Sequence, residues 1–354
     1  MANPPAETPA TPATGITSAL LLLSLSLLSA CGGGSGSGGG SGGTGSAGLD
    51  PLVEDLGIAY VRQPLPEIDP DTDMDLEDIR EPTRFNEGSD LIFRDLASPG
   101  ARERNVSFRV TGGLGDVKDV EASFDGSKLL FALRLPEIEG AAPEDQPTWN
   151  IWEYDIAADT LTRVITSDIN AEAGQDVSPH YLPDSRIIFA STRQRTAKAT
   201  LLDESKPQFS ALDENRNEPA LVLHVMNDDG TDIHQVTFNQ SHDLDPTVLE
   251  NGEVVFSRWD NAGNNSAIHL YKMYPDGTNL RLLYGAESHD TGTNGTTVQF
   301  LQPRELPDGE IAALLKPFSG NFQGGDIITI DVDNYVNNTQ PTAVNTGILA
   351  GPAQ

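Results

Sequence analysis

The chain has 354 residues, of which 53 are acidic and 22 are basic, so its formal charge at pH 7 is −31. A charge this negative offers no electrostatic footprint for a phosphate backbone, and we expect no nucleic-acid partner. The single cysteine excludes an internal disulfide, a Cys-based zinc knuckle and a C-x-x-C-H haem attachment, because each needs at least two cysteines. No catalytic constellation stands out along the chain.

The N-terminal region reads as a targeting segment. Residues 16–30, ITSALLLLSLSLLSA, form an apolar run as long as a signal-peptide core and shorter than the roughly 20 residues of a spanning helix. The run ends in Leu28-Ser29-Ala30-Cys31, which resembles the lipobox of bacterial lipoproteins. The resemblance predicts that residues 1–31 are a lipoprotein signal, with cleavage before Cys31 and acylation of its thiol. An ordinary secretory signal is the alternative, since residues 1–30 contain no Lys or Arg.

Residues 32–50 are rich in Gly and Ser and predict a flexible tether between the anchor and the folded part. Gly32, rather than Asp, follows the cysteine, and resemblance to enterobacterial sorting then favours the outer membrane. We therefore expect a protein held by its lipid on the outer membrane or the periplasmic side of a bacterial envelope, with the membrane as its first partner.

An acidic stretch follows at residues 69–78, DPDTDMDLED. Alternating carboxylates invite a calcium interpretation, because hard cations take oxygen ligands. The spacing does not fit an EF-hand, since neither Asp69 nor Asp71 has Gly at the sixth position or Glu at the twelfth. A solvated acidic loop is the favoured interpretation.

The main signal is an internal repeat. Each copy has a short segment, a tight turn and a β-rich strand. The copies are 119–134, 176–193, 243–260 and 299–316. Their turns carry residue types that accept the positive φ angles of a two-residue hairpin: Asp125-Gly126, Asp184-Ser185, Asn251-Gly252 and Asp308-Gly309. Five residues before the turn, three copies have a proline (Pro179, Pro246, Pro303) and the first has Val120.

Two further strands follow the first hairpin of each copy. They are clearest at residues 150–165, 221–238 and 267–284, where Asp229-Gly230 and Asp276-Gly277 mark turns. An earlier unit is visible in 57–65, 89–96 and 104–110, which we expect to be strands. Four strands per unit predict an all-β fold, a β-propeller of four-stranded blades with about five units visible. The propeller is expected over residues 55–340, with a tail at 341–354.

These residues resemble a known family. The recurring Pro, the turn Asp-Gly, the strand ending in Arg and the following D-G-T are similar to the repeat of TolB-type propellers. The segments 148–156, 180–195 and 239–249 are similar to the propeller part of hydrazine synthase alpha-subunit-like proteins. Propellers of this family close with six or more blades, which implies an open ring or a chain that ends early, and we favour the second. The haem domains that follow the propeller in such proteins have no counterpart in this chain.

Histidines and aspartates near the starts of the repeats form the candidate site. If these starts meet at one mouth of the channel, the following residues would approach one another: Asp176, His180, His242, Asp243, His289 and Asp290. Imidazole and carboxylate ligands would suit a divalent metal such as zinc or calcium. Hydrogen bonds across blade junctions are the favoured alternative. We expect His224 and His269 to be packing residues, the three tryptophans to pack between blades, and Arg134, Arg193 and Arg258 to pair with carboxylates.

The sequence favours a non-enzymatic module that binds a protein partner or a ligand. The alternative is the propeller portion of a hydrazine-synthase-like redox protein whose haem domains lie elsewhere. Neither interpretation assigns a cofactor to this chain.

Overall fold

A computed structural model describes residues 56–64, 78–193 apart from 99, 219–286 apart from 263 and 264, 288–289, 297–318 and 325–332, with isolated residues between 199 and 205. The predicted signal, Cys31, the tether, most of the acidic stretch, Asp290 and the tail lie outside these residues. Within them the chain forms five antiparallel sheets, the blades of a β-propeller, as predicted. Three blades have four strands, and the first and last have three described strands each.

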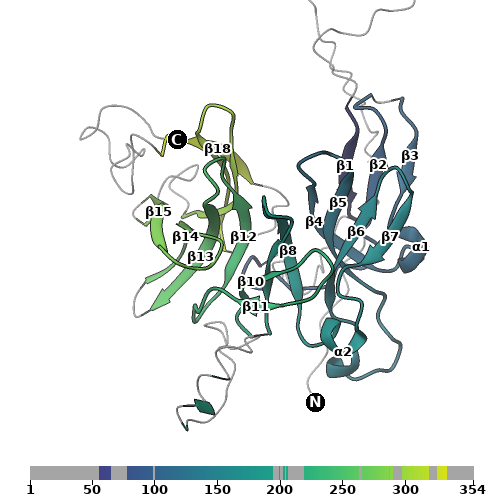
Figure 1. The fold of residues 1–354 in the computed structure, drawn as a ribbon, viewed down its shortest axis with the longest axis horizontal. Coiled ribbons are helices and arrows are strands. Elements are labelled where there is room, and N and C mark those ends of the chain that lie inside the picture. Colours follow the sequence, from purple (N-terminus) through teal and green to yellow (C-terminus); the bar gives the residue numbers. More distant parts are fainter. Residues whose placement is uncertain are drawn as a thin grey trace, which may run out of the picture. The chain divides into compact units, whose positions relative to one another are not determined.

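The blades follow the order of the chain (Figure 1), from the purple and blue strands to the green and yellow ones. Blade one has β1 (Ile58–Arg62), β2 (Asp90–Arg94) and β3 (Glu103–Asn105); blade two has β4 (Asp116–Ala122), β5 (Lys128–Arg134), β6 (Trp149–Asp155) and β7 (Thr160–Arg163). Blade three has β8 (Asp176–Tyr181), β9 (Ile187–Ser191), β10 (Val222–Met226) and β11 (His234–Gln235). Blade four has β12 (Asp243–Val248), β13 (Val254–Ala262), β14 (Asn265–Met273) and β15 (Arg281–Tyr284), and blade five has β16 (Gln299–Glu305), β17 (Ile311–Lys316) and β18 (Asp326–Ile330).

Short helical turns connect some strands: α1 (Phe108–Thr111), α2 (Asp168–Ala171) and a 3₁₀ turn, Pro143–Asp145. α1 corrects the prediction that 104–110 is a strand. The residues before it, β3, do pair with β2. After β3 the N–H of Val106 donates to Leu91 O and the N–H of Leu91 donates to Ser107 Oγ, and the chain then enters the helical turn. Among the described residues, no helix is long and apolar enough to cross a bilayer.

Apolar side chains from neighbouring blades form the core. Val177 of β8 and Leu244 of β12 belong to one buried cluster, and Val255 of β13 and Phe300 of β16 belong to another. Burial of such side chains contributes roughly 1.5–3 kcal/mol each. The three tryptophans pack between blades, as predicted: Trp149 against blade three, Trp152 against blade one and Trp259 against blade five.

The first hairpin of each repeat has a different turn from the predicted two-residue one. In all four copies a backbone N–H closes the turn onto the residue three positions back, as in Gly126 N to Ser123 O at 2.8 Å. Positive φ occurs only at the second residue of each predicted pair (Gly126, Ser185, Gly252 and Gly309). This geometry is a type I turn followed by a left-handed residue, which needs four loop positions instead of two.

Each of the four first strands of blades two to five carries a β-bulge. The pairing of β4, β8, β12 and β16 with the next strand shifts register at the same place in every copy. The bulged residue has a left-handed backbone at Asp119 (φ 57°), Ser178 (50°), Asp245 (53°) and Gln302 (48°). Each of these residues directly precedes the Pro or Val of the repeat. The bulge re-aims the side chains, as bulges do beside functional sites.

Candidate functional site

The four bulges line a hollow of about 310 Å³, which we call the channel cavity. Its walls come from one strand of each blade, β1, β4, β8, β12 and β16, and consecutive strands in this order contact one another. The lining residues are Val61, Asp119, Val120, Ser178, Pro179, Asp245, Pro246, Gln302 and Arg304. Polar bulge residues and the apolar residues that follow them thus alternate around one space.

A hydrogen-bonded chain joins the bulge residues. Asp119 Oδ2 accepts bonds from the backbone N–H of Ser178 at 2.8 Å and from its hydroxyl at 3.2 Å. The same hydroxyl lies 3.2 Å from Asp245 Oδ1, and Asp245 Oδ2 accepts the backbone N–H of Gln302 at 3.1 Å. Two carboxylates from blades two and four are therefore connected through one serine of blade three.

The serine has a single hydroxyl proton, so it can donate to one of the two carboxylates at a time. A bond to both requires a proton on one of them. Burial, and then the charge of Asp119, raise the pKa of Asp245 to about 6. Protonation of Asp245 would supply that proton, because its carboxyl could then donate to Ser178 while the hydroxyl donates to Asp119.

Three ionisable side chains lie beside these hydrogen bonds, each two residues after a bulge residue: Glu121, His180 and Arg304. Arg304 Nη2 bonds to Glu121 Oε2 at 3.0 Å, and His180 Nε2 lies 3.3 Å from Glu121 Oε1. The His180 ring is buried, and its Nδ1 lies 2.8 Å from the carbonyl of Tyr181. Burial lowers the pKa of His180 although Glu121 opposes this, so the ring is neutral at pH 7.

The other end of the channel, where β4, β8, β12 and β16 begin, holds a second cavity of about 410 Å³. Residues 78–86, which we call the covering segment, line it and bond to three other blades. Trp149 Nε1 donates to Thr83 O, His242 Nε2 lies 3.1 Å from Arg80 O, and Ile79 N donates to Phe318 O. Lys118 also bonds to the carbonyl of Pro82.

The covering segment therefore occupies the strand-start end, whereas the channel cavity lies toward the hairpins. The two cavities share the bulge residues and Val61. The covering segment lines the second cavity and does not line the channel cavity.

Two of the predicted site residues form buried ion pairs. Asp176, which is fully buried, pairs with Arg193 through both carboxylate oxygens, and Asp243 pairs with Arg258 Nε at 2.9 Å. These pairs confirm the expected partners of Arg193 and Arg258. Arg134 Nη2 lies 3.5 Å from Glu137, while its Nε donates to the carbonyl of Pro147.

The predicted histidines lie at separate places. His242 Nδ1 accepts the backbone N–H of Leu221, and His289 Nε2 lies 2.8 Å from His269 Nδ1, whereas His180 lies beside Glu121. In the described part of the chain, no three His, Cys, Asp or Glu side chains are arranged to hold a metal ion. Metal binding by Asp176, His180, His242, Asp243, His289 and Asp290 stays a prediction, with Asp290 outside the described residues.

The remaining histidine expectations agree with the packing. His224 and His269 are both buried, and the His224 ring lies 5.7 Å from the ring of Phe189. Burial, and then His289, lower the pKa of His269 to about 4, so it is neutral at pH 7.

The predicted site does not include the four bulge residues that line the channel cavity, Asp119, Ser178, Asp245 and Gln302. Their signal was the alignment of the repeats, in which the position before the Pro or Val is polar in all four copies. A polar residue in one column of every first strand predicts a polar ring where those strands meet.

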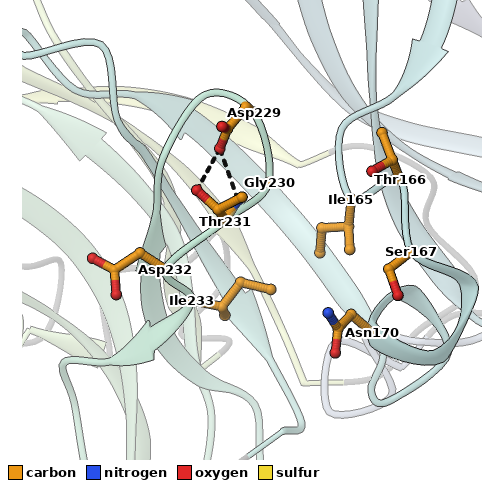
Figure 2. A pocket seen from close by; sticks show the side chains of 9 residues that line it. All are labelled: Ile165, Thr166, Ser167, Asn170, Asp229, Gly230, Thr231, Asp232 and Ile233. Atoms are coloured by element: carbon orange, nitrogen blue, oxygen red, sulfur yellow. Dashed lines mark hydrogen bonds between the residues drawn. The ribbon is translucent and has the colours of Figure 1, made fainter.

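A further hollow, of about 270 Å³, lies between blades two and three. Figure 2 shows its lining, with Asp229 bonded to the backbone and hydroxyl of Thr231 and with Ile165 and Asn170 across the space. These bonds hold the pKa of Asp229 below its usual range. The same bonds belong to the outer hairpin turn of blade three. We therefore interpret this hollow as a gap at the junction of two blades and not as a ligand site.

No protein-family model matches the sequence, and no curated protein matches it as a relative. Solved structures do resemble it. Hydrazine synthase of Kuenenia stuttgartiensis matches 79% of this chain with 18% identity and a TM-score of 0.56. TolB of Acinetobacter baumannii matches 68% with 14% identity and a TM-score of 0.36, and a putative TolB of Agrobacterium tumefaciens matches 56% with 19% identity and a TM-score of 0.30.

The matches cover 38%, 50% and 74% of those three chains in the same order. This chain therefore spans well under half of the hydrazine synthase chain that it resembles. At these identities the likeness is one of fold, and it rests on the hydrazine synthase match, which has a TM-score of 0.56.

Proposed function

We propose that this protein is a lipid-anchored propeller of the bacterial envelope that binds a ligand or a protein partner at the hairpin end of its channel. The observation that carries the proposal is the channel cavity, a hollow of about 310 Å³ with both apolar walls and paired carboxylates. A concave site with a few convergent polar groups is the usual form of a binding site, and propellers bind at such channel mouths.

The polar groups favour binding over catalysis. Ser178 is the hydroxyl in the cavity, and a nucleophilic serine is normally activated by a base such as histidine. The nearby His180 instead directs its two ring nitrogens to Tyr181 O and Glu121. The hydroxyl of Ser178 bonds to the carboxylates of Asp119 and Asp245. These bonds hold the two carboxylates in place, where they can accept hydrogen bonds from a ligand.

The anchor follows from the sequence around Cys31 and is tested separately. The Cys31→Ser variant is expected in the soluble fraction and without incorporated radiolabelled palmitate. Ser35→Ala, four residues along the tether, is the control that keeps both membrane association and label. Palmitate in the Cys31→Ser variant would overturn the anchor.

Partner binding is tested by photo-crosslinking from the hairpin end. A photoreactive residue in place of Phe124, which is 68% exposed at the tip of the β4–β5 hairpin, is expected to capture a discrete partner or ligand. The same residue at Ile169, 85% exposed on α2, is the control. Equal crosslinks at both positions would contradict the assignment of the hairpin end.

A second candidate is the propeller component of a redox complex. The fold likeness to hydrazine synthase over 79% of this chain favours it. A C-x-x-C-H haem attachment would then lie outside these 354 residues, because it needs two cysteines and the sequence has one. Haem absorbance in complexes purified through this protein would support this candidate, and complexes without haem would favour the binding module.

A further inference from the structure

The channel cavity has more negative than positive charge at its floor and rim. Asp119 and Asp245 form the floor, and Glu121 stands beside them. Arg304 is the guanidinium that reaches this group, and it already pairs with Glu121 at 3.0 Å. His180 adds no charge at pH 7 because burial lowers its pKa. The charge of Arg304 also acts on Asp245, but neither floor carboxylate forms an ion pair with a described side chain of the cavity.

The hydrogen bonds of the floor leave acceptor capacity. Each ionised carboxylate can accept about four bonds, and the contacts to Asp119 and Asp245 come from the Ser178 and Gln302 backbone N–H groups and one shared hydroxyl. A ligand that brings N–H donors and positive charge would complete this set.

The walls above the floor are apolar. Val61, Val120, Pro179 and Pro246 line the cavity, and the two prolines are buried. Its volume of about 310 Å³ equals roughly ten water molecules at 30 Å³ each. A bare metal ion would leave these walls without contacts, while a charged head on a short hydrocarbon chain would use both surfaces.

We propose that the channel cavity binds a small organic ammonium ion, a primary amine carried on a short apolar chain. The ammonium group lies between the Asp119 and Asp245 carboxylates and donates to their oxygens. The hydrocarbon chain packs on the apolar walls, formed by Val61, Val120, Pro179 and Pro246. This inference rests on the proposed binding function and names the ligand class of the same site.

The binding is expected to weaken in acid. Protonation of Asp245, whose pKa lies at about 6, removes one of the two charges that hold the ammonium group. The groups that face the floor are Asp119 and Glu121 on β4, His180 on β8, Arg304 on β16 and, across the second cavity, Asp78, Glu81, Arg84, Asp116, Lys118 and Lys316. Of these, His180 has a pKa below its usual value, and its protonation would add a positive charge that opposes the ligand further.

The test is calorimetric titration of the full chain, purified in mild detergent, with butylammonium chloride at about pH 7.5 and pH 5. We expect butylammonium to bind at the higher pH and to bind up to about tenfold more weakly at the lower one, the limit set by protonation of a carboxyl with a pKa of about 6. Butyrate, of opposite charge, and 1-butanol, without charge, are the matched probes that should not bind.

Variants locate the binding site. Asp119→Asn and Asp245→Asn keep the side-chain volume and are expected to lose about tenfold or more in affinity. Asp228→Asn removes the same charge from an exposed hairpin and should bind as the wild type does. A circular dichroism melt confirms that each variant is folded.

Three results would overturn the inference. They are folded wild-type protein that does not bind butylammonium, floor variants that bind it as tightly as the wild type, and calcium chloride that binds and displaces the amine. The outcomes of the palmitate and crosslinking experiments do not depend on any of these three results. Failure of the ligand class and failure of the proposed function are therefore distinguishable.

Discussion

Gly277 of blade four lies directly against Val236 of blade three. A Cβ at Gly277 would stand 2.1 Å from the Val236 carbonyl oxygen, and the glycine has φ of +82°. Gly230 of blade three has the same relationship to blade two, with a Cβ position 2.4 Å from Val164 O. The outer D-G-T hairpins of blades three and four thus hold each of these two blades against the one before it.

Gly277→Ala is therefore expected to destabilise the protein by about 3 kcal/mol or more, since it adds a steric clash to the cost of a left-handed alanine. Gly252→Ala is the matched control, because Gly252 has φ of +81° with open space around its Cβ position. It should cost about 1–2 kcal/mol. Urea unfolding measures both, and equal losses would contradict the blade-locking role.

The buried ion pairs at the strand starts predict a second contrast. Arg193→Met leaves the carboxylate of Asp176 buried and uncompensated, which should cost about 3–5 kcal/mol. The Arg186–Asp184 pair of the adjacent hairpin has side chains that are 33% and 55% exposed, so Arg186→Met should cost less than about 1 kcal/mol. Similar unfolding free energies for the two variants would show that the buried pair is not needed for stability.

The raised pKa of Asp245 predicts how stability depends on pH. The folded protein holds this proton up to about pH 6, while an unfolded chain releases it near pH 4. Unfolding between these values releases a proton, so the free energy of unfolding contributed by Asp245 falls as pH rises from about 4 to 6, by about 2–3 kcal/mol.

Asp245→Asn cannot ionise and should remove that fall. Denaturant unfolding at about pH 4.5 and pH 7.5 should show the variant gaining on the wild type at the higher pH. Asp228→Asn, an exposed residue, is the charge-matched control. Parallel pH profiles for Asp245→Asn and the wild type would exclude a strongly raised pKa.

The covering segment predicts a change that tryptophan fluorescence can detect. Ile79 packs on the buried cluster that contains Trp259 and Leu301. Ile79→Asp should detach residues 78–86 and expose Trp259, which gives a red-shifted emission and stronger acrylamide quenching. Ile169→Asp, at a position that is 85% exposed, should leave the spectrum unchanged. An unchanged spectrum for Ile79→Asp would mean that the segment is not held by this contact.

Much of the fold could be predicted because each blade repeats the same local signals. Asp-Gly and Asn-Gly pairs placed the hairpins, and the buried strands between them are rich in β-branched and aromatic residues. The turn type was wrong, because Asp125-Gly126 fits both a two-residue turn and the longer one found. The strand predicted at 104–110 failed because Phe108 and Val110 also fit one helical turn.

The candidate site was harder to predict. Asp176 and Asp243 are conspicuous beside histidines, yet their charges are neutralised by Arg193 and Arg258. The residues that reach the channel depend on the bulge, which reverses the usual alternation of side chains along a strand. A single sequence shows that Asp119, Ser178, Asp245 and Gln302 share a column, but their left-handed backbones appear only in the folded chain.

The most direct test of the channel as a ligand site is a ¹³C NMR titration of the Asp245 carboxyl carbon, assigned with Asp245→Asn, with and without saturating butylammonium. We predict a pKa of about 6 in the free protein and a lower pKa when the ligand is bound, because a neighbouring cation favours the ionised carboxylate. A carboxyl that titrates near 4 in the free protein, or whose pKa does not respond to the amine, would contradict the assignment.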